Sequence, residues 1–268
     1  MELQGKVVVV TGAASGIDKA MACRFSEEGA AGVVLADLDG DRAQDLAECL
    51  PGPALGVRCD VRDPAQVDAL VTGSESCFGP VDLFCANAGV GAGTDPMSPD
   101  EDWDVSFDVN VRSHVYAARR LLPGWLERGS GWFLSTASAA GLLTQVGGAP
   151  YAVSKHAAVA FAEWLAVTYG DRGIGVSCLC PMGVDTPMLR QGEQEGGMAA
   201  SASATVKAAG DVLQPEQVAG AVVQALRDER FLILPHPEVL TFFQRKAGDY
   251  ERWLAGMRRL QAQVAGAS

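Results

Sequence analysis

The chain has 268 residues, of which 33 are Asp or Glu and 21 are Lys or Arg, so its formal net charge at pH 7 is −12. No run contains more than two adjacent basic residues, which argues against nucleic-acid binding and against adhesion to a membrane through a basic patch. Hydrophobic residues make up 48% and charged residues 20% of the chain, which excludes a disordered protein. We expect a single domain over residues 1–268.

The amino-terminal segment has only a short apolar run, Val7 to Val10, which is shorter than the core of a signal peptide or a spanning helix. We therefore expect a cytoplasmic protein. The seven cysteines form no CxxC pair and have no histidine at ligand spacing, so we expect buried free thiols and no metal site.

Short apolar runs alternate with longer amphipathic stretches over the first 86 residues. The expected strands lie at 6–11, 32–37, 55–60 and 81–86, and the expected helices at 16–29, 40–50 and 64–77. The strands are apolar throughout, as in VVVV and GVVLAD, so helices should cover both faces of the sheet. This rhythm predicts an α/β fold with a doubly wound parallel β-sheet, that is, a Rossmann fold.

The expected elements are longer after residue 98. Helices are expected at 99–128, at 150–171, from Pro215 onward and at 237–262, and strands at 131–136, 174–180 and 231–234. Residues 187–213 contain many Gly, Ala, Ser and Gln residues with little periodicity, which predicts a mobile loop or a lid over a substrate.

The first expected strand runs directly into the turn TGAASGI at residues 11–17, which a helix follows. Such a turn lets backbone N–H groups and a helix amino terminus face an anionic diphosphate, although glycines also end strands for structural reasons.

An acidic residue, Asp37, ends the second expected strand about twenty residues past that turn. A carboxylate there can accept hydrogen bonds from an adenosine ribose and would repel a 2′-phosphate. Leu38 follows it, so no basic side chain is placed to favour NADP. We expect NAD as the cofactor; a helix or turn cap is the alternative role for Asp37.

At these positions the chain resembles the short-chain dehydrogenase/reductase family. The family pattern TGxxxGxG is matched by Thr11, Gly12 and Gly16, whereas Asp18 stands in place of the last glycine. The resemblance implies that the turn binds the cofactor through Gly12, Ser15, Gly16 and Ile17.

Asp18 adds both volume and a negative charge near the expected diphosphate. An acid in the first helical turn is favourable to the helix dipole, yet it repels a bound anion. For charges about 6–8 Å apart at an effective dielectric of about 20, Coulomb's law gives about 2 kcal/mol, or a loss of about thirtyfold in affinity. We expect weakened rather than abolished binding.

Three further segments resemble the family in order, although the first two, at residues 60–61 and 87–89, could also be structural turns. The resemblance implies that Asp60 and Val61 hold the adenine ring and that the backbone of Asn87, Ala88 and Gly89 lines the cofactor. It also implies that the loop PMGVDT binds the cofactor through Pro181, Gly183, Val184 and Thr186, with the Val184 backbone and the Thr186 hydroxyl contacting the nicotinamide carboxamide. Met182 replaces the usual glycine in that loop and is expected to narrow the space beside the nicotinamide.

The strongest pattern combines Ser138 with the helix segment YAVSK and with Asn110 upstream in DVNVRSH. Tyr151 and Lys155 are four residues apart on an expected helix and therefore share one face. The resemblance implies that Asn110 supports a relay water and that Ser138 holds the substrate oxygen. It also implies that Lys155 binds the nicotinamide ribose and lowers the pKa of Tyr151.

Tyr151 is the expected base. A tyrosine with a pKa near 10 is a poor base at neutral pH, but a nearby ammonium and a positive nicotinamide stabilise its phenolate. It could then take a hydroxyl proton as hydride leaves the carbinol carbon. With Tyr151 present, no catalytic role is expected for His114, His156 or His236.

We therefore expect an NAD-dependent oxidoreductase that interconverts a secondary alcohol and a ketone. Leu142, Leu143 and Val146 would favour an apolar substrate over a charged one. The family implies a homodimer or homotetramer formed through helices 99–128 and 150–171. Two alternatives remain open: a sensing or scaffolding protein that binds cofactor poorly because of Asp18, and another reaction with retained cofactor, such as epimerisation or dehydration.

Overall fold

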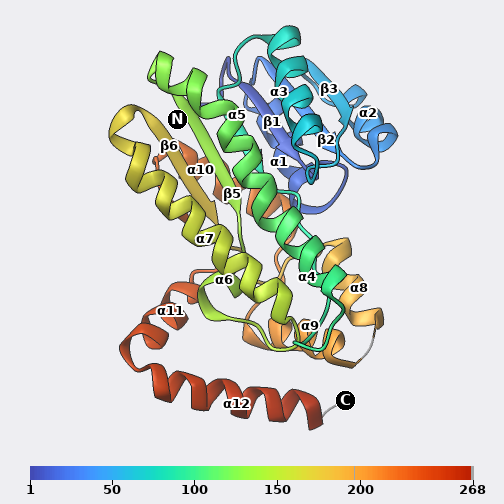
Figure 1. Ribbon diagram of the computed structural model, residues 1–268, viewed down its shortest axis with the longest axis vertical. Helices are drawn as coiled ribbons and strands as arrows, with labels where there is room; N and C mark the ends of the chain where they lie inside the picture. The colour runs from blue at the N-terminus through green and yellow to red at the C-terminus, as the bar shows by residue number, and fades with distance from the viewer. Residues whose placement is uncertain (196, 267–268) are drawn as a thin grey trace.

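A parallel sheet of seven strands forms the centre of the protein, whose computed structural model describes residues 1–195 and 197–266 (Figure 1). The strand order is β3-β2-β1-β4-β5-β6-β7. The strands are β1 (Val7–Thr11), β2 (Gly32–Asp37), β3 (Ala54–Arg58), β4 (Leu83–Ala86), β5 (Gly131–Thr136), β6 (Ile174–Leu179) and β7 (Leu232–Ile233). Since β1 is flanked by β2 and by β4, the winding reverses between β1 and β4, and ligands of such sheets bind beyond the strand ends at this point. The expected doubly wound Rossmann fold is thus confirmed.

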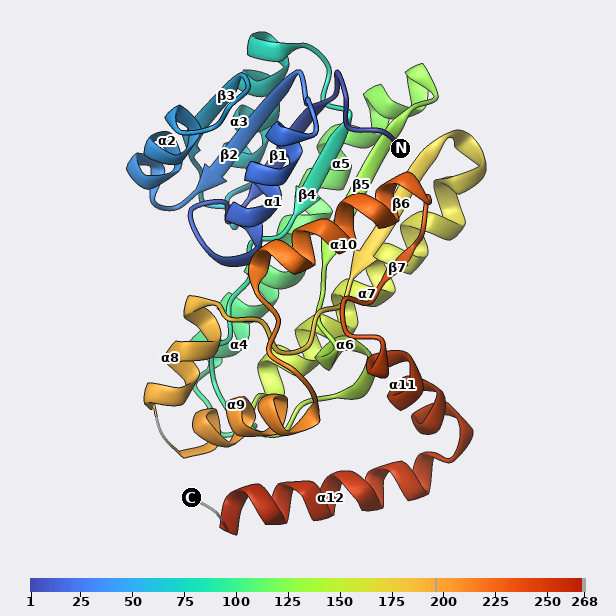
Figure 2. The same ribbon diagram turned by 180° about the vertical axis from the view of Figure 1, so that it is seen from behind.

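Helices cover both faces of the sheet. The helices of the first half are α1 (Gly16–Glu27), α2 (Gly40–Glu48), α3 (Pro64–Phe78), α4 (Asp100–Phe107), α5 (Ser113–Arg128) and α6 (Ala140–Leu143). Those of the second half are α7 (Ala149–Tyr169), α8 (Pro187–Glu195), α9 (Gly197–Ala209), α10 (Pro215–Arg227), α11 (Glu238–Gly248) and α12 (Tyr250–Gly266). Helices α3, α5 and α7 pack on one face, and α1 and α10 on the other (Figures 1 and 2).

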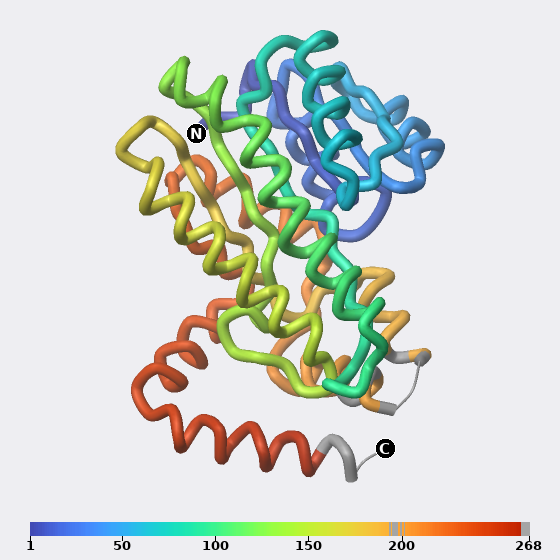
Figure 3. The backbone as a smooth tube through the Cα atoms, viewed as in Figure 1, coloured from blue at the N-terminus to red at the C-terminus, as the bar shows by residue number. Residues whose placement is uncertain are grey.

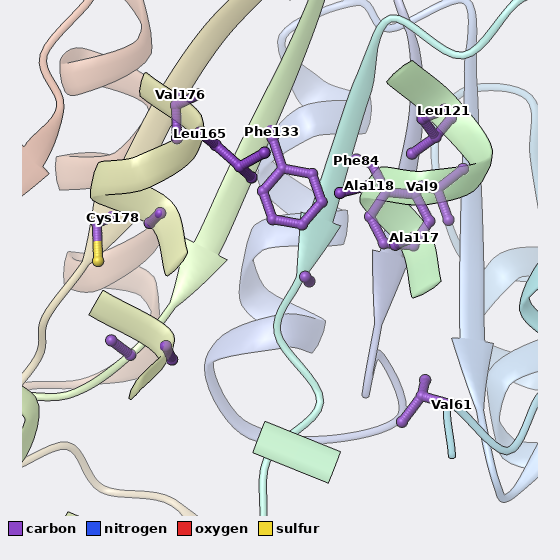
Figure 4. Packing of buried hydrophobic residues seen from close by; sticks show 14 of the residues in the cluster. Val9, Val61, Phe84, Ala117, Ala118, Leu121, Phe133, Leu165, Val176 and Cys178 are labelled. Carbon is purple, nitrogen blue, oxygen red and sulfur yellow. The ribbon is translucent and has the colours of Figure 1, made fainter. Parts of the chain in front are cut away.

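The continuous apolar strands supply both cores because alternate side chains of a strand point to opposite faces. In β1, Val7 and Val9 join the cluster under α3, α5 and α7, whereas Val8 and Val10 join the cluster under α1 and α10. Figure 4 shows Phe84 and Phe133 at the centre of the first cluster, with ring centroids 6.2 Å apart.

The predicted helix over 99–128 contains a π-helical turn, η1 (Asp108–Arg112), between α4 and α5. Turns of this type occur frequently at functional sites. The sequence predicts an uninterrupted helix here and does not reveal this turn.

The prediction of a loop over 187–213 was wrong in its secondary structure. These residues form α8 and α9, joined through residue 196, which lies outside the described residues. Alanine is the strongest helix former, and the abundance of Ala in 199–209 outweighs the missing periodicity.

The predicted carboxy-terminal helix over 237–262 is two helices. Asp249 has an extended backbone, with φ −153° and ψ 90°, and its Oδ1 accepts a hydrogen bond of 2.9 Å from the Arg252 backbone N–H. Gly248 and Asp249 therefore end α11 and cap α12. Figure 3 shows that α12 then runs across the molecule beyond the carboxyl ends of β5 and β6.

Among residues 1–195 and 197–266, no helix has the length and apolarity needed to cross a membrane. All seven cysteines are free, but the expected burial holds for only four of them: Cys23 is half-buried, and Cys49 and Cys77 are exposed.

Candidate active site

The predicted site residues meet at the carboxyl edge of the sheet. The glycine-rich turn follows β1, Asp37 ends β2, and residues 87–89 follow β4. Ser138 follows β5, and the loop 181–186 follows β6. Parallel strands bring all these segments to one edge, around the point where the winding reverses.

The turn after β1 has the geometry of an anion-binding loop. Gly12 and Gly16 have φ angles of +76° and +59°, a region that glycine occupies without strain. A Cβ atom on Gly12 would lie 3.0 Å from the Ala88 Cα atom, so the two backbones require this close approach. Ser15 is the N-cap of α1, and its side chain makes no capping hydrogen bond in the described chain. The first-turn N–H groups of α1 are therefore available to an anion.

A threonine at the end of β1 holds the neighbouring strand end in place. The Thr11 hydroxyl donates to the Cys85 carbonyl at 3.2 Å and accepts from the N–H groups of Asn87 at 3.0 Å and Ala88 at 3.1 Å. The Thr136 hydroxyl, at the end of β5, donates to the Asn87 side-chain oxygen. The Asn87 side chain thus ties the loop after β4 to the end of β5.

The two acids predicted to contact the adenosine half lie at the ends of β2 and β3. Asp37 accepts hydrogen bonds from the N–H groups of Ala14 at 2.9 Å and Asp39 at 3.0 Å, so its carboxylate is held beside the turn. Asp60 is engaged by the Arg62 guanidinium at 2.6 Å, and hydrogen bonds from Arg62 lower the pKa of its carboxyl group. Val61, which follows, is buried.

Ser138, Tyr151 and Lys155 are brought together. Tyr151 and Lys155 lie one turn apart on α7, and the Lys155 Nζ atom is 5.7 Å from the centre of the Tyr151 ring. Lys155 is only 2% exposed, and its Nζ atom donates to the Thr136 carbonyl at 2.9 Å. The Ser138 hydroxyl accepts from the Ala140 N–H at 3.1 Å, and Ser138 and Tyr151 line the same cavity.

Asn110 lies in the π-turn η1 and uses both ends of its amide. Its Nδ2 atom donates to the Val90 carbonyl and to the Ser154 Oγ atom, each at 3.0 Å, and its Oδ1 atom accepts from the Val90 N–H at 3.0 Å. A Cβ atom on Gly89 would lie 3.3 Å from Lys155 Nζ. The Asn110 side chain therefore sets the loop after β4 against Lys155.

Burial shifts the titration of the catalytic candidates. It raises the pKa of Tyr151 above the ordinary value, although the hydrogen bond with Ser138 opposes the shift. It lowers the pKa of Lys155 to about 8, against the attraction of the Asp18 carboxylate. The expected stabilisation of the Tyr151 phenolate relied on Lys155 together with a bound nicotinamide, and in the protein alone burial is the larger effect.

Asp18 packs directly against the glycine-rich turn. Its Oδ2 atom lies 2.7 Å from the position that a Cβ atom on Gly12 would take. Burial raises the pKa of Asp18 well above the ordinary aspartate value, Asp37 raises it further, and Lys155 opposes both effects. Asp18 therefore keeps its proton to a higher pH than a surface aspartate does.

The loop after β6 is held by a histidine that the sequence analysis set aside. The His236 side chain is 2% exposed; its Nδ1 atom accepts from the Met182 N–H at 3.2 Å, and its Nε2 atom lies 2.9 Å from the Gly183 carbonyl. The tautomer protonated at Nε2 satisfies both contacts. On the other side, the Leu213 N–H donates to the same Gly183 carbonyl at 2.9 Å.

Two adjoining positions of this loop complete the predicted set. Val184 is buried and pairs with Leu213, and the Thr186 Cγ2 atom would lie 3.4 Å from a Cβ atom on Gly16. The loop therefore closes on the glycine-rich turn. In the sequence, nothing links His236 to the loop 181–186 except its position between two prolines.

A cavity of about 1380 Å³ opens beside Ser138 and Tyr151. Leu143 and Met182 line it near these residues, as do several side chains of α8, α9, α11 and α12. Leu142 is instead packed in the core, and the cavity lining in the described chain does not include Val146. The volume exceeds that of ordinary ligand pockets, about 300–1,000 Å³. The lining also includes Ser15, Gly89 and Thr186, so the cavity spans the expected cofactor positions as well as the space beside Ser138 and Tyr151. No group of described His, Cys, Asp and Glu residues could hold a metal ion.

Comparisons with known proteins agree with this geometry. A family model described as short chain dehydrogenase matches residues 6–196. A 1-deoxy-11-beta-hydroxypentalenate dehydrogenase of Streptomyces exfoliatus is 39% identical over 247 residues, which cover 89% of this chain and 86% of that protein. A 3beta-hydroxysteroid dehydrogenase 2 of Eggerthella lenta is 33% identical, with 85% of this chain and 90% of that protein covered.

Among solved structures, a short chain dehydrogenase/reductase of Burkholderia phymatum in complex with NAD superposes with a TM-score of 0.85. It is 32% identical, and the match covers 94% of this chain and 96% of that one. The family model spans well over half of the chain, and the relatives align along most of its length. This protein belongs to the short-chain dehydrogenase family of oxidoreductases.

Proposed function

We propose that the protein is an NAD(H)-dependent enzyme that interconverts a secondary alcohol and a ketone on an apolar carbon skeleton. The observation that carries the proposal is the gathering of Ser138, Tyr151 and Lys155 at the switch point of the sheet, beside a cavity of about 1380 Å³. The Burkholderia protein holds NAD, and the Streptomyces and Eggerthella proteins are named as dehydrogenases of hydroxylated compounds. These names support the proposed reaction type.

The residues present fit a dinucleotide. The uncapped first turn of α1 would hold the diphosphate, and Asp37, held beside the Ala14 N–H, would accept from the adenosine ribose in preference to a 2′-phosphate. Asp60 and Val61 would flank the adenine, and residues 87–89 with the loop 181–186 would line the nicotinamide half. When bound, the nicotinamide would accept a hydride from the carbinol carbon.

The remaining chemistry belongs to the protein side chains. The Ser138 hydroxyl would donate to the substrate oxygen while the Tyr151 phenolate removes its proton. Lys155, held by the Thr136 carbonyl, would keep a positive charge beside the tyrosine ring. In the direction of reduction, neutral Tyr151 would donate the proton instead.

Replacing the base is the direct test of this function. In Tyr151→Phe, we expect NADH formation from a panel of alicyclic secondary alcohols to fall by about 10²–10⁴-fold, while the unfolding temperature stays close to that of the parent protein. Tyr169→Phe, at the far end of α7, is the matched control and should keep full activity. An unchanged rate in Tyr151→Phe would exclude this tyrosine as the base.

The proposal also fixes the direction of the pH dependence. Because the pKa of Tyr151 is raised and oxidation needs its phenolate, kcat/KM for oxidation should increase as the pH rises through neutrality into the alkaline range. By contrast, kcat/KM for ketone reduction should fall over the same pH range. An oxidation rate that declines with rising pH would contradict the assignment.

Asp18 generates a prediction about cofactor affinity. We expect Asp18→Asn to bind NAD more tightly than the parent at neutral pH, by less than the roughly thirtyfold that a full charge would give. Since the pKa of Asp18 is raised, lowering the pH protonates it. The parent should therefore bind NAD more tightly at weakly acidic pH, and the Asp18→Asn variant should lose that dependence.

Titration calorimetry across pH measures this effect, with Asp45→Asn on the exposed side of α2 as the control for lost charge. Equal affinity and equal pH dependence in the parent and in Asp18→Asn would contradict the prediction. If neither protein bound NAD, the alternative of a sensing or scaffolding protein would replace the enzyme assignment.

His236 generates a prediction about the nicotinamide loop. In His236→Phe, the loss of two hydrogen bonds to Met182 and Gly183 should release the loop and raise the KM for NAD by about tenfold, since each bond contributes about 0.5–1.5 kcal/mol. His156→Phe is the control, because among the described residues the His156 side chain bonds only to the Ala152 carbonyl of its own helix. A lower unfolding temperature with unchanged KM would limit His236 to a structural role.

The outer face of α7 supports a subunit interface. Val153, Trp164 and Val167 are 47%, 54% and 87% exposed and follow each other at helical spacing. We propose assembly of two or four subunits through α5 and α7. Trp164→Glu should lower the mass measured by light scattering to that of a monomer, whereas Glu163→Gln should leave it unchanged; a monomeric parent would refute the interface.

A further inference from the structure

We propose that the wall formed by α11 and α12 binds a carboxylate carried by the substrate, at the end of its apolar skeleton away from the oxidised carbon. This inference rests on the proposed function, because it describes the far end of the same cavity. It departs from the sequence-based expectation of a wholly apolar substrate.

Three arginines line the cavity on this wall. Arg245 lies on α11, and Arg252 and Arg259 lie on α12. They are spaced seven residues apart, so Arg252 and Arg259 lie on one side of α12 about 10 Å from each other along its axis. The other described residues that line the cavity include a single acidic side chain, that of Asp249.

No described side chain pairs with these three arginines. None of the three forms an ion pair or a side-chain hydrogen bond with any described residue, in contrast to Arg190 and Arg227, which are paired with acids. The Asp249 carboxylate accepts from the Arg252 backbone N–H, so it caps the helix. Guanidinium groups on a cavity wall are well suited to a carboxylate, which they can bind through two parallel hydrogen bonds.

A tryptophan on the same wall contributes apolar surface. Trp253 lines the cavity and also packs against the buried cluster under α3, α5 and α7. Its Nε1 atom is buried from solvent, so the guanidinium groups are the donors that this wall offers to a ligand.

The charge distribution separates this wall from the rest of the protein. The chain has a net charge of −12, yet residues 238–266 contain five basic and three acidic residues. A local positive region within an acidic protein attracts an anion to that place specifically. The path from this wall to the sheet is more apolar, since Leu143, Leu189 and Val206 line it.

The proposed reacting groups and the arginines lie at opposite ends of the cavity, so a substrate that carries both a carbinol and a carboxylate could contact both ends. Ser138 and Tyr151 lie at the carboxyl edge of the sheet, and α12 lies beyond α9 at the end of the molecule farthest from β1–β3 (Figures 1 and 2). A carbinol at Tyr151 and a carboxylate at α12 would orient a rigid skeleton between them. Only one face of the carbinol would then be presented to the cofactor side.

Binding of a non-reactive pair of probes tests the wall without turnover. We would titrate the full-length protein with adamantane-1-carboxylate and with adamantane-1-carboxamide, which differ mainly in charge. We expect the carboxylate to bind about tenfold more tightly than the amide, with a preference that declines in high salt. In Arg252→Gln/Arg259→Gln the preference should disappear while the amide binds as before.

Arg258→Gln is the matched control, because Arg258 has the same charge on the same helix but does not line the cavity. Equal binding of the two probes to the parent, no binding of either probe, or an equal loss in Arg258→Gln would each overturn the proposal.

A second arm separates this inference from the proposed function. Oxidation of alicyclic hydroxy acids is compared with that of their methyl esters, and the double variant should raise KM for the acids only. Carboxylate binding without any alcohol oxidation would remove the proposed function and keep the anion site. Oxidation with equal kcat/KM for acids and esters would keep the proposed function and remove the anion site.

Discussion

The site depends on the burial of one ammonium group. Lys155 lies almost fully inside the protein, where an unpaired charge is strongly unfavourable, and its pKa falls accordingly. The Thr136 carbonyl, the Tyr151 ring and the attraction of Asp18 compensate in part. Since Thr136 also holds Asn87, the lysine, the end of β5 and the loop after β4 form one connected unit. A shift in any of them would move the others.

The same charge connects the glycine-rich turn to α7. Asp18 raises the pKa of Lys155, and Lys155 lowers the pKa of Asp18. The acid that replaces the third glycine of the family pattern is therefore more than an obstacle to a diphosphate. It also stabilises the charged form of Lys155. The repulsion between Asp18 and an anion at the turn is therefore linked to the positive charge that Lys155 keeps on α7.

Most of the fold and the central site could be predicted from the sequence, because both depend on local patterns. Continuous apolar runs such as VVVV have no stable place except a strand covered on both faces, and the spacing of Tyr151 and Lys155 places them on one helix face. The π-turn at Asn110 could not be predicted, since its partners, Val90 and Ser154, are distant in sequence. His236 was missed for the same reason. The helices over 187–209 were missed because alanine-rich helices carry little periodicity.

The division of the cavity between two parts of the chain has a consequence for how such a protein can diversify. The reacting groups belong to segments that precede residue 187 and are tied into the sheet, whereas the arginine wall belongs to α11 and α12, which are joined at Asp249 and lie outside it (Figure 3). Exchanging residues on that wall changes no contact within the central sheet. Under the proposed function, substrate preference could therefore change through substitutions in α11 and α12, while Ser138, Tyr151 and Lys155 keep their positions.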